Sequence, residues 1–279
     1  MGILYLVATP IGNMDDISKR AIEILEGVSL IAAEDTRVTG SLLKKLDIKN
    51  KMVSYYEHNS AKRSDFLISH LISGNDIAIV SDAGTPAISD PGEDIVAKCI
   101  ENNIEVIPIP GACAFLSGLT VSGFSTKKFT FLGFLGHKSS ERKKELEGYK
   151  SNTETLIFYE APHRLTKTLT DMSEVFSEDR KICLSREITK KFEEHKRFTI
   201  KEALAYYEEN PVKGEFVIVV EGNKKGKENE LTCLSLEEHL NHYLDKGLTN
   251  KEAYKEIAKD RNIQKREIYD YFNKFNKEK

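Results

Sequence analysis

The chain has 279 residues, 40% of them hydrophobic, which is enough to bury a core in each of two compact domains. Forty-one basic and 44 acidic residues leave a formal net charge of -3, so the chain lacks the overall positive field of many nucleic-acid-binding proteins, and any such contact must come from a local patch. The four cysteines are scattered, which argues against a disulfide scaffold and a metal site and predicts a reduced, cytoplasmic chain. The apolar run at Ile3–Val7 is too short to cross a bilayer, which argues against membrane insertion.

Short β-branched runs alternate with stretches of helical period through the first 118 residues. The predicted strands are Ile3–Val7, Leu30–Ala33, Met52–Tyr55, Ile77–Val80 and Val106–Ile109. This alternation is typical of a parallel sheet covered by helices. We therefore expect residues 1–118 to form an N-terminal α/β domain.

A second alternating set predicts another α/β domain at residues 119–222. Its expected strands are Phe129–Phe131, Thr155–Tyr159, Lys181–Ser185, Arg197–Ile200 and Glu215–Val220, with helices beginning near Ser139, Arg164 and Lys201. The Gly and Ser residues of 118–126 predict a short linker between the two domains. Two sheets that meet at such a linker would form a cleft suited to a small ligand.

The composition changes after Gly222, and residues 223–279 are expected to form a linker and a helical extension. Asn223–Glu230 is polar and lacks apolar periodicity. Ser235–Glu238 and Thr249–Glu252 both match the capping box that opens a helix, and a third helix is expected near Gln264. The short gap between the second and third helices is compatible with a helix-turn-helix, although most small helical tails with this pattern are only packing modules.

Three loops after predicted strands of the first domain have unusual composition. They are Ala8–Asn13, Ser81–Gly92 and Pro108–Ala114, all rich in small residues that let backbone approach a ligand. None matches a dinucleotide fingerprint or a P-loop. Ligands of open parallel sheets bind at the carboxyl ends of the strands, so these loops are candidates for a site. As alternatives, Asp90 could cap the next helix and Cys113 could be a small packing residue.

Ionisable residues also gather after other predicted strands. The groups are Ala33–Arg37, Tyr56–Asn59, Phe158–Arg164 and Ser185–Lys190. Their position at one sheet edge suggests a site. The ordinary alternatives stay open for each: Asp35 could cap a helix, and the other charged groups could be solvated or paired at the surface.

These segments, in this order, resemble the tetrapyrrole methylase superfamily and, within it, the ribosomal RNA small subunit methyltransferase I family. The matching text is LYLVATPIGN, AAEDTR, YYEHN, VSDAGTPAISDPG, PIPGACAF, FLGFLGHK, TLIFYEAPHR and SREITKKFEE. The resemblance covers about residues 3 to 222, and the helical tail resembles the extension that many members carry. Segments as long as VSDAGTPAISDPG and FYEAPHR do not agree by chance.

The resemblance implies a two-domain α/β fold, a homodimer, and S-adenosylmethionine bound in the cleft between the domains. The product would be the 2′-O-methyl group of cytidine 1402 in 16S rRNA. By similarity, the cofactor contacts would come from Ile11, Ala83, Gly84, Thr85, Ile88, Cys113, Ala114, Glu160, Glu187 and Ile188. No metal is required by this chemistry, and no metal-ligand cluster is predicted.

An in-line methyl transfer needs the attacking ribose oxygen close and aligned, and a nearby base would help to remove its proton. Asp35, Glu34 and His58 are candidate bases, and Arg37 is a candidate clamp in the same site. Contacts with RNA are expected from Arg37, Asn59, His163, Arg164, Lys265 and Arg266, and a basic stretch at residues 137–144 could also approach the RNA backbone.

Two other functions remain compatible with the sequence. A methyltransferase of the same superfamily could act on a tetrapyrrole or a protein side chain, and a non-catalytic ribosome-assembly factor could bind RNA through the helical tail. The first would methylate a porphyrinogen rather than small subunits. The second would show no stabilisation by the cofactor.

Overall fold

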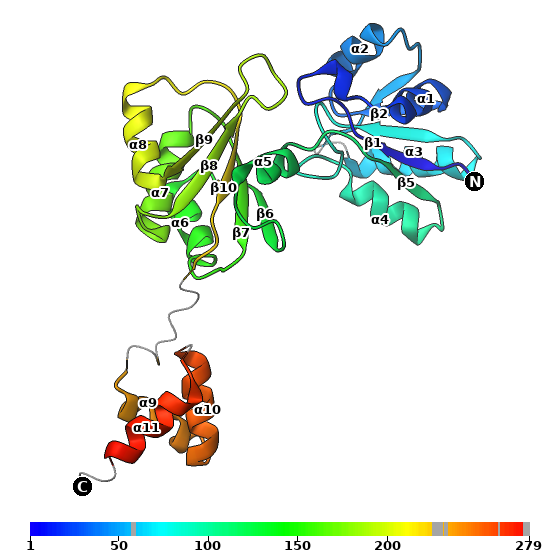
Figure 1. Cartoon of the computed structure of the whole chain (residues 1–279). Helices are drawn as coiled ribbons and strands as arrows, with labels where there is room; N and C mark the ends of the chain where they lie inside the picture. Colours follow the sequence, from blue (N-terminus) through cyan, green and yellow to red (C-terminus); the bar gives the residue numbers. More distant parts are fainter. Residues whose placement is uncertain (57–59, 225–230, 232–233, 262, 276–279) are drawn as a thin grey trace. The chain divides into compact units, whose positions relative to one another are not determined.

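The computed structural model describes residues 1–56, 60–224, 231, 234–261 and 263–275 (Figure 1). The five strands expected in the N-terminal part are confirmed as β1 (Leu4–Val7), β2 (Leu30–Ala33), β3 (Met52–Ser54), β4 (Ile77–Val80) and β5 (Val106–Ile109). They form one sheet in the order β3-β2-β4-β1-β5, and every neighbouring pair is parallel. This order places the ends of β4, β1 and β5 side by side.

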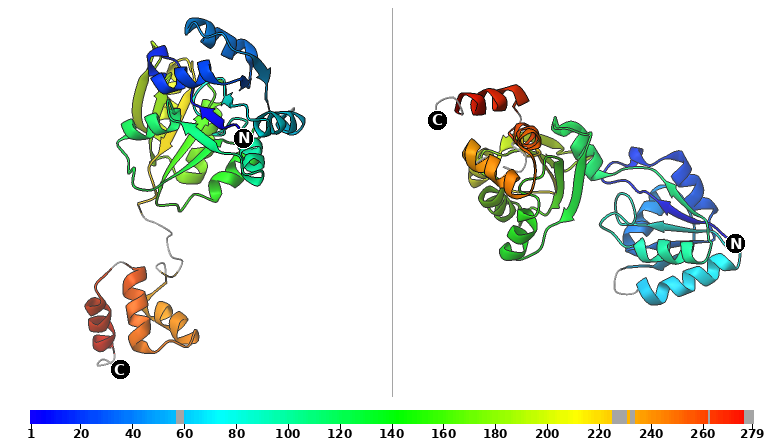
Figure 2. Two further views of the ribbon diagram at one scale, coloured as in Figure 1. Left: turned by 90° about the vertical axis from the view of Figure 1, so that its right-hand side faces the viewer. Right: turned by 90° about the horizontal axis from the view of Figure 1, so that it is seen from below.

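Helices cover both faces of this sheet, as Figure 2 shows. They are η1 (Met14–Asp16), α1 (Lys19–Gly27), α2 (Thr36–Lys45), α3 (Ser60–Ile72) and α4 (Glu93–Glu101). Successive side chains of a strand point to opposite faces. Ile77 and Ile79 of β4 accordingly pack with residues of α3 and α4, while Ala78 and Val80 pack with residues of α1 and α2. Burial on both faces explains why these strands are almost wholly apolar.

The second set of strands forms a mixed sheet. Its strands are β6 (Phe129–Phe134), β7 (Thr155–Glu160), β8 (Lys181–Arg186), β9 (Glu194–Thr199) and β10 (Phe216–Val220), in the order β6-β7-β10-β8-β9. Only β6 and β7 are parallel to each other, and the remaining pairs are antiparallel. The helices α6 (Ser139–Glu147), α7 (Leu165–Phe176) and α8 (Ile200–Glu209) lie together on one side of this sheet in Figure 1.

The expected position of the fourth strand of this set was wrong by three residues at its start. Residues 197–200 were predicted, but β9 spans Glu194–Thr199 and Ile200 begins α8. Thr199 accepts a hydrogen bond from the amide of Glu202, and the Glu202 carboxylate accepts one from the amide of Thr199. This capping box ends the strand at Thr199, since it satisfies amides that a helix leaves free.

Residues 118–126 do not form the simple linker that their composition predicts. Ala114–Ser122 is the helix α5, which packs on the second sheet. A Cβ atom at Gly118 would lie 2.8 Å from Cγ1 of Val217, so only glycine allows the helix to approach β10 this closely. Leu119 adds its side chain to the apolar cluster of the same sheet.

The tail forms three helices, as expected: α9 (Leu236–Asp245), α10 (Asn250–Asp260) and α11 (Lys265–Phe275). Both predicted capping boxes are confirmed, at Ser235 with Glu238 and at Thr249 with Glu252. The three helices share a small core built around Ile257, Ile268 and Phe272.

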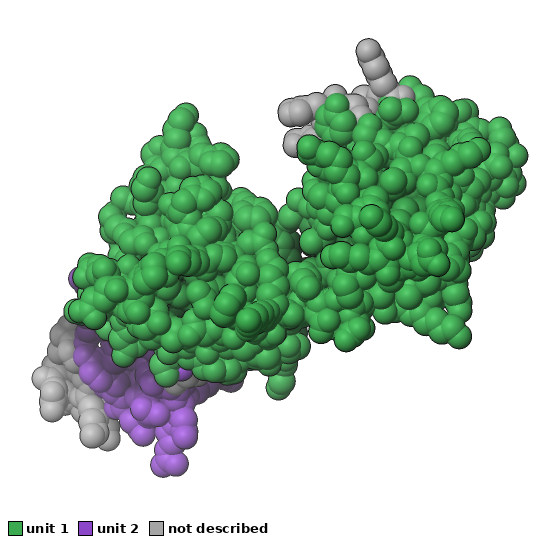
Figure 3. All heavy atoms as spheres, turned by 90° about the horizontal axis from the view of Figure 1, so that it is seen from above, with its two compact units in different colours: residues 1–148, 154–222 green, residues 149–153, 223–279 purple. Residues whose placement is uncertain are grey.

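The chain divides into two compact units, coloured in Figure 3. Unit 1 contains residues 1–148 and 154–222, and unit 2 contains residues 149–153 and 223–279. Both sheets belong to unit 1. The further division of unit 1 into domains at residue 118 stays a prediction. Within the described residues, no helix combines the length and the apolarity needed to span a membrane.

Candidate active site at the carboxyl edge of the first sheet

The loops that follow β1, β4 and β5 are tied to one another. The amide of Thr9 donates to the carbonyl of Gly84 at 2.8 Å, and the amide of Gly84 donates back to Thr9 at 3.1 Å. The hydroxyl of Thr85 donates to the carbonyl of Ala112 at 3.2 Å. Gly84 has a φ of 86°, which glycine adopts without a steric penalty. The three loops therefore form one connected platform of backbone.

A pocket of about 350 Å³ opens on this platform. All ten residues expected to contact the cofactor line it: Ile11, Ala83, Gly84, Thr85, Ile88, Cys113, Ala114, Glu160, Glu187 and Ile188. The first seven come from the loops of the first sheet and the start of α5, and the last three come from the second sheet and the turn after β8. The structure thus brings together residues that are as far apart as 11 and 188 in the sequence.

Residues that the sequence analysis did not single out also line this pocket. Tyr159 is the clearest, since its hydroxyl accepts a hydrogen bond from the amide of Phe115 at 3.2 Å and its ring meets Phe131 edge to face at 5.0 Å. Burial raises the pKa of Tyr159 to about 12, so the phenol stays neutral. Phe134 and Val217 add apolar surface. Tyr159 stands inside the quoted FYEAPHR segment, so the motif could have indicated it.

Six carboxylates among the described residues line the same pocket, and three of them, Glu34, Asp82 and Asp90, come from the loops of the first sheet. The amide of Asp82 donates to Oε2 of Glu34 at 3.2 Å, which places these two residues side by side. Burial, together with the negative charges of Glu34 and Asp82, raises the pKa of Asp90 to about 6. Burial also raises the pKa of Glu34 and of Asp82. The pocket therefore concentrates negative charge where water is partly excluded, which favours a cationic ligand.

Asp90 does not cap the next helix. The N-cap residue of α4 is Gly92, and no side chain accepts a hydrogen bond there. Asp35, by contrast, does cap α2, because its Oδ1 accepts the amide of Arg37 at 2.8 Å. The capping alternative is therefore wrong for Asp90 and confirmed for Asp35.

Asp35 and Arg37 do not line the first pocket but a second one beside it. The guanidinium of Arg37 binds the Asp35 carboxylate through Nε at 3.0 Å and Nη2 at 2.6 Å. These hydrogen bonds, with the one from the Arg37 amide, lower the pKa of Asp35 to about 2. A carboxylate with so low a pKa is a weak proton acceptor. Asp35 as the catalytic base stays a prediction that this geometry does not favour.

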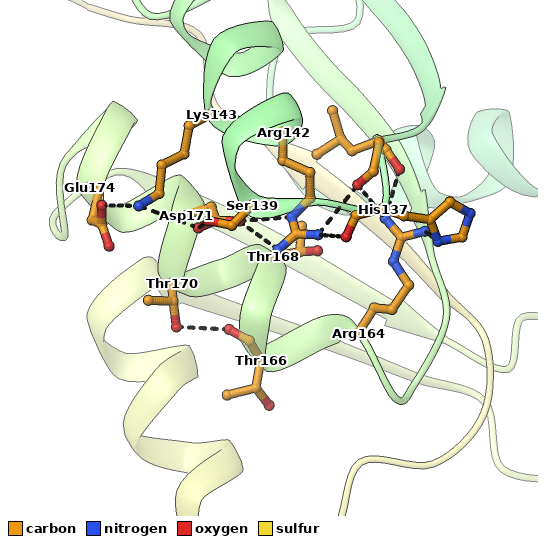
Figure 4. A network of polar contacts seen from close by, with 12 residues as sticks. His137, Ser139, Arg142, Lys143, Arg164, Thr166, Thr168, Thr170, Asp171 and Glu174 are labelled. Atoms are coloured by element: carbon orange, nitrogen blue, oxygen red, sulfur yellow. Dashed lines mark hydrogen bonds and ion pairs between the residues drawn. The ribbon is translucent and has the colours of Figure 1, made fainter.

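Glu160 is buried at the end of β7 and its hydrogen bonds are satisfied inside the protein. Its carboxylate accepts hydrogen bonds from the hydroxyl of Thr168 and the amide of Ala161, and lies 3.2 Å from Nε of Arg164. Nη2 of Arg164 also donates to the carbonyl of Leu135 at 2.7 Å (Figure 4). Only 12% of the Arg164 side chain is exposed, so its contact with RNA stays a prediction that this geometry does not favour.

Arg142 differs from the solvated residue that its basic stretch suggests. It is buried, donates through Nε to Asp171 at 2.8 Å and through Nη1 to the carbonyl of His137 at 2.7 Å (Figure 4). Asp171 also accepts from the hydroxyl of Ser139 at 2.6 Å. This network joins α6 to α7 and holds the turn after β6. A charge pattern alone does not distinguish a buried arginine from an exposed one.

The carboxylate of Glu187 is likewise used within the protein. Its Oε1 accepts the amide of Glu215 at 3.1 Å and lies 3.1 Å from Nζ of Lys190. Glu187 and Thr189 have φ values of 50° and 68°, so the turn after β8 is tight. A ligand in the pocket would therefore meet the backbone of this turn.

The remaining predicted residues lie elsewhere. His58 and Asn59 lie outside the described residues. His163 is exposed and lines neither pocket. Lys265 and Arg266 belong to α11 in unit 2, where Arg266 keeps 88% of its side chain exposed. Among the described residues, no three His, Cys, Asp or Glu side chains are grouped so that they could hold a metal ion.

Known proteins share this fold and much of this sequence. Residues 3–204 match the family described as Tetrapyrrole (Corrin/Porphyrin) Methylases. A uroporphyrin-III C-methyltransferase from Thermus thermophilus superposes with a TM-score of 0.58, covering 79% of this chain and 94% of its own, at 18% identity. A structure of such an enzyme in complex with S-adenosylhomocysteine gives a TM-score of 0.57, covering 78% of this chain and 97% of its own, at 16% identity. Fold and family match thus define the class as a methylase.

Relatives of nearly full length narrow the class. A protein of Bacillus subtilis (strain 168) is 48% identical over 277 residues, which is 98% of this chain and 94% of the relative. One from Synechocystis sp. (strain ATCC 27184 / PCC 6803 / Kazusa) is 46% identical over 269 residues, 96% of each chain. Both are named ribosomal RNA small subunit methyltransferase I. The chain belongs to the tetrapyrrole methylase family and, within it, to the ribosomal RNA small subunit methyltransferase I family.

Proposed function

We propose that this chain transfers a methyl group from S-adenosylmethionine to the ribose 2′-hydroxyl of cytidine 1402 in the 16S rRNA of the small ribosomal subunit. The observation that carries the proposal is the pocket in which the loops after β1, β4 and β5 meet Glu160 and the turn at Glu187 and Ile188. The names of the full-length relatives support an rRNA substrate. Such a substrate would place the enzyme in the cytoplasm.

The residues of the pocket fit S-adenosylmethionine. Ile11, Ile88 and Val217 supply apolar surface for the flat, weakly polar adenine ring. Glu34 and Asp90 supply negative charge for a ligand that carries a cationic sulfonium and an ammonium group. When bound there, the cofactor would supply a methyl group activated by attachment to positively charged sulfur.

In the reaction, the chain would position the reactants and exclude water from the pocket. The backbone platform of the three loops is fixed by the Thr9–Gly84 and Thr85–Ala112 hydrogen bonds, so it needs little rearrangement on binding. The neutral phenol of Tyr159 and the ring of Phe134 keep water from one side of the pocket. Positioning of this kind accounts for much of the rate of a displacement whose leaving group is already good.

A variant that fills the pocket tests the cofactor part of the proposal. Ala83 is exposed and lines the pocket, so Ala83→Trp should block it without disturbing the core. At a hundred times its dissociation constant, the cofactor should stabilise the unmodified protein by about 2.7 kcal/mol, and it should not stabilise Ala83→Trp. Ala97→Trp on the exposed side of α4 is the matched control. Thermal unfolding with and without S-adenosylhomocysteine measures both.

The substrate part needs a transfer assay. Labelled S-adenosylmethionine is incubated with small subunits from cells lacking this activity, and in parallel with a porphyrinogen. Methylation of ribose at cytidine 1402, mapped by mass spectrometry, is the expected result. Label in the porphyrinogen alone would assign the chain to tetrapyrrole chemistry, and no stabilisation by the cofactor would favour a non-catalytic assembly factor. The homodimer implied by the resemblance stays a prediction.

A further inference from the structure

A second pocket, of about 620 Å³, lies next to the first one. We call it the α2 pocket and define it by Thr9, Pro10 and Gly12 of the β1 loop and Arg37, Ser41 and Lys45 of α2. The three helical residues are spaced by four, so they share one face of the helix. The volume falls within the range of roughly 300 to 1,000 Å³ that small-molecule sites occupy.

Asp82 is common to both pockets among the residues that the structure describes. Its carboxylate is held in place, because Oδ1 accepts the amide of Asp35 at 3.0 Å, and its own amide donates to Glu34 at 3.2 Å. In the described part of the chain, no group donates a hydrogen bond to the other oxygen, Oδ2. Oδ2 of Asp82 therefore lies between the two pockets and can accept a hydrogen bond from a ligand.

The α2 pocket also carries cations. Arg37 is held by Asp35 through Nε and Nη2, which fixes its plane, while 89% of its side chain remains exposed. Lys45 is exposed and makes no ion pair with any described residue. A fixed guanidinium and an unpaired ammonium on one helix face suit the phosphate of a nucleotide. Val38 and Leu42 on the same face add apolar surface.

We propose that the α2 pocket receives the target nucleotide of a single-stranded RNA segment, with its phosphate at Arg37 and Lys45 and its ribose hydroxyl at Oδ2 of Asp82. This inference rests on the proposed function, since it names the site where the RNA substrate of that reaction binds. Single-stranded nucleotides can be splayed out of their stack to enter such a pocket.

The same arrangement gives Asp82 a role in the chemistry. The hydroxyl proton passes to Oδ2 of Asp82 as the ribose oxygen forms its bond to the methyl carbon, and the electron pair of the broken carbon–sulfur bond stays on sulfur. Burial raises the pKa of Asp82, and the charge of Asp35 raises it further, whereas the amide of Asp35 and the charge of Arg37 lower it. A raised pKa makes a carboxylate a better proton acceptor. Asp35, whose own pKa is lowered by Arg37, is the poorer base of the two.

Substitutions in α2 test the pocket. Ser41→Trp should fill it, and Lys45→Glu should repel the phosphate; both positions are exposed, so the fold should persist, which circular dichroism checks. Lys44→Glu, one residue away and in neither pocket, is the matched control. With small ribosomal subunits as substrate, the first two variants should raise KM by about tenfold or more, and the control should stay within about twofold. The affinity for S-adenosylhomocysteine, measured by calorimetry, should not change in any of them.

Asp82→Asn tests the proton transfer. It should lower kcat by about a hundredfold or more, while KM for small subunits and the affinity for S-adenosylhomocysteine stay within about threefold. Full activity of both Ser41→Trp and Lys45→Glu would overturn the nucleotide pocket, and an unchanged kcat of Asp82→Asn would overturn the role of that carboxylate. If the unmodified chain binds S-adenosylhomocysteine but methylates no RNA, the proposed function fails and this inference fails with it. If the unmodified chain methylates RNA and the variants keep full activity, this inference fails and the proposed function stands.

Discussion

Two aspartates near the pockets show how the surroundings of one residue type decide its chemistry. Asp35 is partly exposed and bound by Arg37, which lowers its pKa to about 2. Among the described residues, Asp90 has no cationic partner of this kind; it lies with Glu34 and Asp82 where water is partly excluded, which raises its pKa to about 6. Near neutral pH, Asp35 is therefore a fixed anion, while Asp90 can respond to a bound cation.

This difference predicts a pH dependence of cofactor binding. A cation in the pocket stabilises the ionised form of Asp90 and lowers its pKa, so the affinity for the cation should rise as the pH increases from about 5 to 7 through the pKa near 6. S-adenosylmethionine carries the sulfonium charge and S-adenosylhomocysteine does not. Calorimetry should show that the affinity for S-adenosylmethionine rises more steeply with pH than the affinity for S-adenosylhomocysteine.

Asp90→Asn removes the titrating group and serves as the comparison. In this variant, the ratio of the two affinities should vary less with pH than in the unmodified chain. If the ratio keeps its original pH dependence in Asp90→Asn, another group is responsible and the role given to Asp90 is wrong.

At the scale of elements, the helices α6 and α7 depend on a buried ion pair. Nη2 of Arg142 lies 2.7 Å from Oδ2 of Asp171, and both side chains are at most 5% exposed. The same guanidinium donates to carbonyls of the turn that follows β6 (Figure 4). The pair thus connects the packing of two helices to the strand whose last residue, Phe134, lines the first pocket.

Arg142→Met should lower the free energy of unfolding by about 3 to 5 kcal/mol, because it leaves the buried Asp171 charge with the more distant and more exposed Lys143, 3.7 Å away, in place of the buried guanidinium. The double variant Arg142→Met/Asp171→Leu should recover most of this loss, since two apolar side chains can replace a buried pair. Lys144→Met, exposed on the same helix, is the control. Urea denaturation measures all three, and equal stability of the single and double variants would contradict the argument.

At the scale of the whole molecule, the helical tail is a compact unit with its own core. All residues that line the two pockets belong to unit 1. The net charge of -3 means that binding to RNA depends on where the cations are placed rather than on their total. In the tail, Lys265 and Arg266 are the cations that the sequence analysis assigned to RNA.

We expect Lys265→Gln/Arg266→Gln in the full chain to weaken binding to small subunits and to reduce the slope of log affinity against log salt by about 1 to 2, as the loss of two phosphate contacts requires. Lys251→Gln/Lys255→Gln, two exposed lysines of α10, should leave the slope unchanged. Deletion of residues 232–279 should reduce the slope at least as much and leave cofactor affinity unaltered. An unchanged slope in the deletion would mean that the tail neutralises no phosphate.

By itself, the sequence determined the features that depend on neighbouring residues. Apolar runs such as Ile77–Val80 and capping boxes such as Ser235–Glu238 act within one strand or one helical turn, so they predict the ten strands and the tail helices. The position of β9 differs from the prediction because the capping box at Thr199 ends the strand and begins α8. The ends of parallel strands meet at one edge of a sheet, which indicated the loops after β1, β4 and β5 as a site. The ten individual residues of the first pocket came from the family resemblance.

Only the tertiary structure decided what depends on residues far apart in the chain. Arg142 and Arg164 are interior because α7 and the turn after β6 enclose them, and position 118 needs glycine because α5 lies so close to β10. The position of Asp82 between two pockets and the raised pKa of Asp90 follow from burial and from the charges that folding brings near. The lowered pKa of Asp35, by contrast, comes from Arg37, only two residues along the chain. Burial and charge proximity are properties of distances in space, which local patterns of residue types do not contain.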